Sequence, residues 1–125
     1  MGAENVEILE LDLNLVSIST FKPHEIFLFV GIFYHLENLY LILKNVSELA
    51  AEQLIVETHL DALDLDGPEM IHYPGAELNN DGTNFWGPNP ECVSGMLKNC
   101  GFNRIQYSPY PGFPNRGIFM LTGKL

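Results

Sequence analysis

The longest apolar run of the chain covers residues 26–34 and is bounded by polar residues on both sides. An uninterrupted run of this kind is typical of a parallel strand that is buried on both faces. We therefore expect a strand over residues 25–33, which delivers Gly31, Tyr34 and His35 at its carboxyl end. Open α/β sheets bind their ligands at that edge. The alternative is a core strand that leads into a helix start and binds nothing.

Other apolar residues follow the periods of helices and of strands. Residues 37–51 carry apolar side chains three and four positions apart, which predicts a helix with Asn38 as its amino-terminal cap. Residues 53–58 predict a second buried strand. In residues 6–11, apolar and acidic side chains alternate, so we expect a strand with one face in water.

The second half of the chain is punctuated by glycine and proline. Residues 60–83 are rich in Asp, Asn, Gly and Pro, and long irregular segments inside a compact domain usually serve a function. Residues 90–100 predict a helix that Asn89 caps. Residues 103–107 and 117–122 predict two strands joined by a rigid connector rich in proline. Because these strands are close in sequence, we expect them to pair antiparallel.

Composition narrows the class of protein. The chain has 125 residues, which is enough for one domain with its own core, and its net charge is −10. This charge opposes tight binding to a phosphate backbone, so direct nucleic-acid binding is not expected. No apolar run is long enough to span a bilayer, and the amino terminus has no secretory pattern. Cys92 and Cys100 are too far apart on one predicted helix to form a disulfide, which fits a reducing, cytoplasmic setting.

Four blocks of aromatic and polar residues follow the predicted strands. They read Phe-Tyr-His-Leu at 33–36, Glu-Thr-His-Leu-Asp at 57–61, Tyr-Pro-Gly-Ala-Glu-Leu-Asn at 73–79 and Thr-Asn-Phe-Trp-Gly-Pro-Asn-Pro at 83–90. In this order the blocks resemble the class I S-adenosylmethionine-dependent methyltransferases. The most similar branch is the group around the wobble-uridine tRNA carboxymethyltransferase. The resemblance extends over residues 5–125, and its first and last blocks are the most specific.

The resemblance implies an α/β fold: a Rossmann-like methyltransferase sheet, truncated at its N-terminus. This sheet is expected to be mostly parallel, with a C-terminal antiparallel strand pair. The family's glycine-rich cofactor loop should precede residue 5, but Gly2 is the only early glycine and the G-x-G spacing is absent. The acidic residue that holds the ribose is missing with it. We therefore expect residues 1–125 to form a single partial domain, the C-terminal half of such an enzyme.

The resemblance assigns five residues to the methyl donor, S-adenosylmethionine or carboxy-S-adenosylmethionine. Tyr34 and Arg116 would hold the carboxylate of the carboxylated donor, because a phenol and a guanidinium both donate hydrogen bonds to such a group. Gly31 would allow close approach to the backbone, with His35 beside it, and Asp12 would lie next to the adenine. Each residue also has a structural alternative: a packed Tyr, a surface Arg, a turn Asp. The family's further carboxylate contact, an amino-terminal Lys, is absent.

The acceptor side is expected at the end of the second buried strand. Glu57 and His59 share one face if the strand continues, and either is a candidate general base. The resemblance places Asn84, Phe85 and Trp86 at the acceptor, where the aromatic rings would stack on a nucleoside. The alternative is that the Trp anchors the loop to the core. No spacing typical of a metal site is present, so no metal is expected.

We therefore expect methyl or carboxymethyl transfer to an oxygen or nitrogen of a small-molecule or nucleoside acceptor, a tRNA wobble nucleoside being one such acceptor. The fragment is expected to bind its donor weakly or not at all. The alternative is a non-enzymatic truncated domain that acts as an oligomeric or partner-bound module. Because the strand over residues 25–33 would have an open edge, we also expect a homo-oligomer. Either residues 6–11 move in beside this strand, or two chains pair across the gap.

Overall fold

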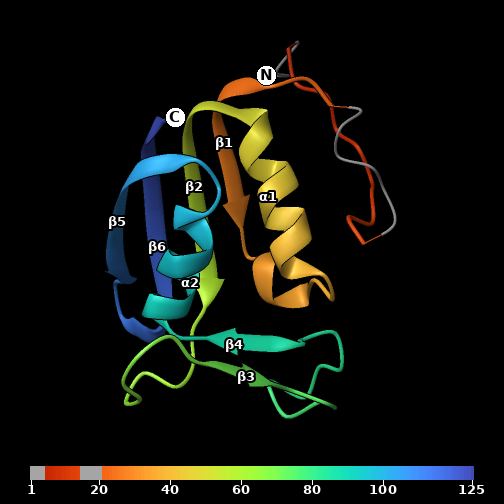
Figure 1. The fold of residues 1–125 in the computed structure, drawn as a ribbon. Helices are drawn as coiled ribbons and strands as arrows, with labels where there is room; N and C mark the ends of the chain where they lie inside the picture. Colours follow the sequence, from red (N-terminus) through yellow and green to blue (C-terminus); the bar gives the residue numbers. More distant parts are fainter. Residues whose placement is uncertain (1–4, 15–20) are drawn as a thin grey trace.

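The computed structural model describes residues 5–14 and 21–125. Their elements form a four-stranded sheet with two α-helices and a separate two-stranded sheet. The two-stranded sheet lies at the bottom of the view in Figure 1. In chain order the elements are β1 (His24–Val30), the 3-10 helix η2 (Phe33–His35), α1 (Leu39–Leu49), β2 (Ala50–His59), β3 (Met70–His72), β4 (Trp86–Pro88), α2 (Pro90–Lys98), β5 (Phe102–Tyr110) and β6 (Phe113–Lys124).

The main sheet has the strand order β1-β2-β6-β5. β1 and β2 are parallel, and β6 is antiparallel to both of its neighbours, β2 and β5. The expectation of a mostly parallel sheet is therefore wrong for the described strands, because one of the three strand pairs in this sheet is parallel. The predicted antiparallel pair at the end of the chain is confirmed. Its strands are longer than expected, because the proline-rich connector continues both strands up to a tight turn at Gly112, where φ is 79°.

The predicted helices are present, with shorter bounds. Asn89 caps α2 as expected, since its side chain accepts a hydrogen bond from the N–H of Cys92 at 2.9 Å. Asn38 occupies the predicted N-cap position of α1, but its side chain makes no capping hydrogen bond. No helix in residues 5–14 or 21–125 has the length and apolar character needed to cross a bilayer.

The predicted strand at residues 6–11 is wrong. This segment is extended but pairs with no described strand, and it runs outside the sheet, beyond α1 (Figure 1). A pocket of about 750 Å³ separates it from Phe27 of β1 and Val46 of α1. Alternation of apolar and acidic residues gives a strand only where a neighbouring strand supplies backbone partners. Residues 6–11 have not moved in beside β1, so that expected repair of the sheet edge does not occur.

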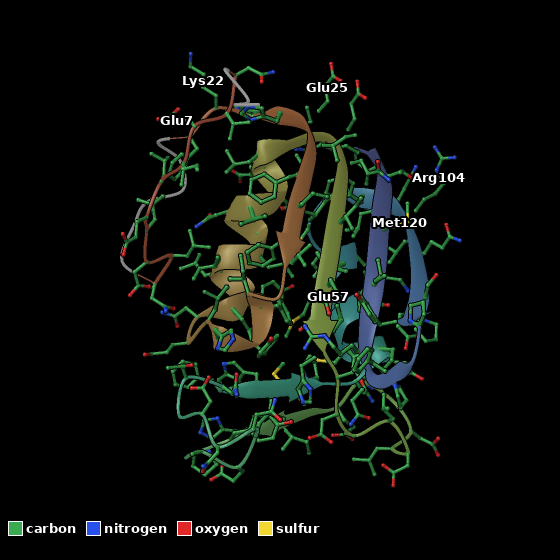
Figure 2. The ribbon with its side chains drawn as sticks, turned by 180° about the vertical axis from the view of Figure 1, so that it is seen from behind. Glu7, Lys22, Glu25, Glu57, Arg104 and Met120 are labelled. Carbon is green, nitrogen blue, oxygen red and sulfur yellow. The ribbon has the colours of Figure 1, made fainter. Side chains whose placement is uncertain are left out.

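The two faces of the main sheet are unequal. α1 and α2 both cover one face, where Phe29, Leu54 and Phe119 form the core. The opposite face, turned toward the viewer in Figure 2, carries no helix from the described residues. The expectation that β1 is buried on both faces is therefore wrong, because alternate side chains of its apolar run are exposed: Ile26 by 56%, Leu28 by 63% and Val30 by 50%.

The small sheet closes the carboxyl end of the main one. β3 and β4 are antiparallel and lie beneath the ends of β1 and β2 (Figure 1). The segment predicted to be irregular, residues 60–83, therefore contains a strand, which a run of only three residues does not announce in the sequence. Backbone hydrogen bonds hold the small sheet in place: the N–H of Phe85 donates to the carbonyl of Tyr34, and that of Asp61 donates to Pro88.

Candidate functional site

The end of β1 turns sharply toward the small sheet. Gly31 has a φ of 69°, a left-handed conformation that favours glycine, and its N–H donates to the carbonyl of Glu57. A Cβ at this position would meet its nearest neighbour, Glu57 Oε2, at 3.9 Å, which is an ordinary contact. Backbone conformation, and not close approach of a neighbour, therefore requires the glycine. The turn leads directly into η2, which presents Tyr34 and His35.

Arg116 forms a two-pronged ion pair with Glu57. Its Nε and Nη2 lie 2.5 Å and 2.9 Å from the two carboxylate oxygens. The Arg116 side chain is 29% exposed and that of Glu57 is 8% exposed, so the pair lies at the edge of the interior. Hydrogen bonding to Glu57 raises the pKa of Arg116, while partial burial opposes that rise. Figure 2 shows Glu57 on the uncovered face, near the carboxyl end of β2.

Tyr34 and Arg116 come together, although they are far apart in sequence. The guanidinium carbon of Arg116 lies 5.5 Å from the centre of the Tyr34 ring, within the range of a cation–π contact. Both residues also adjoin His59, because Arg116 is its register partner on β6 and the Tyr34 ring lies edge-on at 5.9 Å. Together with Glu57, the partner of Arg116, the structure thus gathers four of the sequence-predicted site residues at one edge of the sheet.

His59 belongs to a second, more buried group of polar side chains. Its Nε2 lies 2.9 Å from the hydroxyl of Tyr73, and that hydroxyl donates in turn to Asp61. Burial lowers the pKa of His59, as does Arg116, and the negative charge of Asp61 counteracts both. Burial and the bond to Asp61 raise the pKa of the Tyr73 phenol. His59 is therefore neutral near pH 7 and able to accept a proton.

Gly87 makes room for this group. A Cβ on Gly87 would lie 2.1 Å from the Tyr73 hydroxyl oxygen and 2.7 Å from the Asp61 Cβ, distances at which atoms clash. Only glycine therefore lets β4 pass beside the Tyr73–Asp61 contact. The role of the glycine in the Trp-Gly-Pro block is to admit two neighbouring side chains.

The other residues predicted to contact the acceptor hold the small sheet in place. The amide of Asn84 donates to the carbonyl of Leu78 at 2.9 Å. Trp86 is half-buried, packs against the core and lies 4.8 Å from the ring of His72, measured between ring centres. The backbone carbonyl of Phe85 accepts from the His72 ring. The contacts of Trp86 are those expected from the alternative interpretation, in which the Trp anchors the loop to the core.

His35 and Asp12 also have structural partners. The Nδ1 of His35 donates to the carbonyl of Thr83 at 2.8 Å, which ties η2 to the loop before β4. The carboxylate of Asp12 accepts from the N–H of Asn14 at 2.9 Å and so closes a turn in the segment outside the sheet. His35 is thus part of the carboxyl edge, whereas Asp12 is not among the residues gathered there.

Three residues of the site were not predicted as such: Asp61, Tyr73 and Gly87. All three lie within the motif blocks that carry the family resemblance, so the blocks pointed to the right region. What the sequence did not reveal is that the loop after β2, the end of β3 and β4 meet around His59. The residues that the structure describes contain no cluster of three or more metal-ligating side chains.

Comparison with known proteins identifies the fold. No protein-family model and no curated protein matches the sequence. The N-terminal domain of EvdMO1, crystallised in the presence of SAH and D-fucose, matches with a TM-score of 0.64 and 20% identity, over 97% of this chain and 55% of that one. The CurJ carbon methyltransferase matches with a TM-score of 0.60 and 16% identity, over 92% and 34% of the two chains.

A third match is magnesium protoporphyrin IX methyltransferase (ChlM) from Synechocystis PCC 6803 with bound SAH. Its TM-score is 0.57 at 15% identity, over 91% of this chain and 49% of that one. The chain thus has the fold of SAM-dependent methyltransferases, and the predicted α/β methyltransferase-like fold is confirmed at this level. It spans 34–55% of the length of these three structures.

Proposed function

We propose that this chain forms the acceptor side of a SAM-dependent methyltransferase, which transfers a methyl or carboxymethyl group to an oxygen or nitrogen atom. The observation that carries this proposal is the convergence of Tyr34, His59 and the Arg116–Glu57 pair at the carboxyl ends of β1 and β2. Ligands of open α/β sheets bind at this edge. The proposed setting is cytoplasmic.

The residues present fit only the transfer end of a sulfonium donor. Tyr34 and Arg116 would hold a donor carboxylate, but Glu57 already accepts from two nitrogens of Arg116, so a carboxylated donor has to compete with it. No described residue supplies a glycine-rich loop. SAM and carboxy-SAM are therefore both candidates, and donor binding by these residues alone is weak. When bound, such a donor supplies an activated one-carbon group.

His59 is the residue that we assign to remove a proton from the acceptor. It is neutral near pH 7 because burial lowers its pKa, and it adjoins Tyr34 and Arg116. Glu57, the other predicted base, is less suited, because both of its oxygens accept hydrogen bonds from Arg116.

The acceptor that we favour is a small molecule or a free nucleoside. A tRNA wobble nucleoside is also a candidate acceptor, but the net charge of −10 opposes contact with the phosphate backbone around it. The second candidate function is a non-enzymatic module in a homo-oligomer or bound to a partner. It is supported by the exposed Ile26, Leu28 and Val30 on the uncovered face.

The proposal is tested by titrating the ¹⁵N-labelled protein with SAH, with SAM and with carboxy-SAM. Calorimetry at micromolar ligand should show no saturable binding. At millimolar ligand, amide shift changes should cluster at residues 31–35 and around Arg116. Arg116→Gln should weaken the response to a carboxylated donor more than the response to SAM, whereas Arg104→Gln, at an exposed position on β5, should change neither.

Two outcomes would contradict this assignment. Shift changes confined to the segment outside the sheet, or none at millimolar ligand, would favour the non-enzymatic module. A clear calorimetric isotherm at micromolar ligand would show that the described residues hold more of the donor than the transfer end, and the acceptor-side assignment would fall.

A further inference from the structure

Each carboxylate oxygen of Asp61 accepts a hydrogen bond from a residue nearby. Its Oδ1 accepts from the N–H of Ala62 at 2.7 Å, and its Oδ2 accepts from the hydroxyl of Tyr73. Ala62 has a φ of 52°, a left-handed conformation that residues other than glycine seldom adopt. The loop therefore has an unusual backbone conformation directly after Asp61, the residue whose two carboxylate oxygens accept these hydrogen bonds.

The hydrogen bonds of Tyr73 determine which ring nitrogen of His59 carries the hydrogen. A phenol carries a single hydrogen, and that of Tyr73 is directed to Asp61. The Tyr73 oxygen can then only accept from the Nε2 of His59, which lies 2.9 Å away. Nε2 must therefore carry the imidazole hydrogen. A neutral imidazole has one N–H, so Nδ1 holds the free lone pair.

We infer that Asp61 and Tyr73 fix His59 in its Nε2–H tautomer and thereby make Nδ1 the proton-accepting atom of the site. The catalytic meaning of this inference rests on the proposed function, in which His59 acts as the base. Nδ1 takes the proton of an O–H or N–H group on the acceptor, and the bonding electron pair stays on the acceptor atom, which becomes the nucleophile. Asp61 and Tyr73 are positioning residues, because they act through His59.

The charges around the ring suit this role. The carboxylate of Asp61 stabilises the imidazolium that forms, through the Tyr73 hydroxyl. The positive charge of Arg116 opposes it, but Glu57 is paired with that charge. Tyr34 contributes the edge of a ring. The imidazolium keeps its Nε2–H on Tyr73, so the chain of hydrogen bonds is unbroken before and after the proton arrives.

The other three histidines of the chain are arranged in the opposite way. Each places Nδ1 against a backbone carbonyl: His24 on Lys22 at 3.0 Å, His35 on Thr83 at 2.8 Å and His72 on Phe85 at 3.0 Å. A carbonyl oxygen can only accept, so Nδ1 is the protonated nitrogen in all of them. Within residues 5–14 and 21–125, His59 is therefore the one histidine whose contacts select Nε2–H.

This difference is directly measurable. Long-range ¹H–¹⁵N correlation spectra of ¹⁵N-histidine-labelled protein identify which ring nitrogen carries the hydrogen. They are recorded at about pH 8, above the ordinary histidine pKa of about 6.5. We expect the Nε2–H pattern for His59 and the Nδ1–H pattern for His35 and His72. An Nδ1–H pattern for His59 in the wild-type protein overturns the inference. No donor or acceptor is required, so the outcome is independent of the proposed methyl transfer.

Asp61→Asn gives the sharpest test, because the new amide reverses the hydrogen bond. The amide oxygen faces the N–H of Ala62, which leaves the NH₂ group facing Tyr73. The Tyr73 hydroxyl then accepts from Asn and donates to His59, so the tautomer should switch to Nδ1–H. The matched control is Asp64→Asn at an exposed position of the same loop, which should leave every histidine signal in place. A His59 that keeps Nε2–H in the Asp61→Asn protein contradicts the inference.

Tyr73→Phe removes the intermediate hydroxyl and should abolish the tautomer preference, giving a mixed pattern for His59 alone. Its control is Tyr107→Phe, a half-buried phenol on β5. Unchanged signals of His35 and His72 verify that the fold is intact. Unchanged His59 signals in Tyr73→Phe would overturn the positioning role. If the tautomer results hold but no SAH-dependent shifts occur at the carboxyl edge, the proposed function fails and the hydrogen-bond assignment stands.

Discussion

The carboxyl edge of the sheet and its uncovered face differ in how completely their side chains are partnered. At the edge, Glu57, His59 and Asp61 all make side-chain hydrogen bonds to residues from other parts of the chain. On the uncovered face, Leu28 and Met120 are exposed apolar residues. Both regions involve the same strands, so the difference does not come from the strands themselves. It comes from what packs against them.

The two regions differ in whether elements of the described chain cover them. Parallel strands are normally buried on both faces, and here both helices lie on one. The helices α1 and α2 pack on the covered face, and the strands β3 and β4 pack against the carboxyl edge. The uncovered face is an apolar surface of the kind that binds another molecule or another copy of the chain.

Truncation of neighbouring β6 residues should separate the two faces. Phe119 is fully buried and Met120 is 39% exposed. Phe119→Ala should lower the free energy of unfolding by about 3–5 kcal/mol, the usual cost of removing a buried aromatic ring. Met120→Ala should lower it by about 1 kcal/mol or less. Urea denaturation measures both. Equal losses would mean that the uncovered face is buried in solution.

The Arg116–Glu57 ion pair should contribute less to the free energy of unfolding than the buried Phe119 side chain, and more than an exposed charged residue. Glu57→Gln leaves the guanidinium of Arg116 without its charged partner at a partly buried position. We expect a loss of about 1–3 kcal/mol, below the usual cost for a fully buried pair because Arg116 keeps access to water. Glu52→Gln, at an exposed position of the same strand, is the control and should change stability by about 0.5 kcal/mol or less. A loss no larger than that of the control would show that the pair is screened.

Association should depend on the uncovered face and not on exposed apolar residues in general. We propose that the chain forms a homo-oligomer through β1, whose outer edge pairs with no described strand. Leu28→Glu should weaken association about tenfold or more, which corresponds to about 1.4 kcal/mol. Leu63→Glu, at an exposed loop position, should not. Light scattering reports the mass, and a wild-type monomer at high concentration would rule out the oligomer.

The smallest effect concerns pH. Because the pKa of His59 is lowered in the folded state, the unfolded chain binds a proton below pH 6.5 that the folded chain does not yet bind. Stability should therefore be greatest above pH 6.5 and decline as pH falls toward the folded-state pKa. His59→Asn should reduce this slope, whereas His24→Asn, at an exposed position, should preserve it. Urea denaturation at several pH values below and above 6.5 measures how the free energy of unfolding depends on pH. Identical slopes for wild type and His59→Asn would contradict a lowered pKa of His59 in the folded state.

The sequence predicted the elements more reliably than their surroundings. The apolar run that became β1, the periodic residues of α1 and the Asn89 cap of α2 all depend on neighbours close in the chain, so their patterns are readable. The alternation in residues 6–11 is equally clear but produced no strand. A strand depends on partners that lie elsewhere in the chain, and the sequence pattern does not contain them.

For the candidate site, the sequence by itself determined which residue types were available and roughly where: Tyr34 and His35 after one strand, Glu57 and His59 at the end of the next, and Arg116 before the last. It did not determine that Gly31 ends its strand: the strand was expected to continue to residue 33, whereas β1 ends at Val30 and Gly31 turns the chain with a φ of 69°. Only the tertiary structure decided that Arg116 pairs with Glu57, and that Tyr73 and Asp61 enclose His59 beside Gly87. Hydrogen bonds and close contacts between distant segments depend on positions within a few tenths of an ångström, which packing sets and sequence periodicity does not.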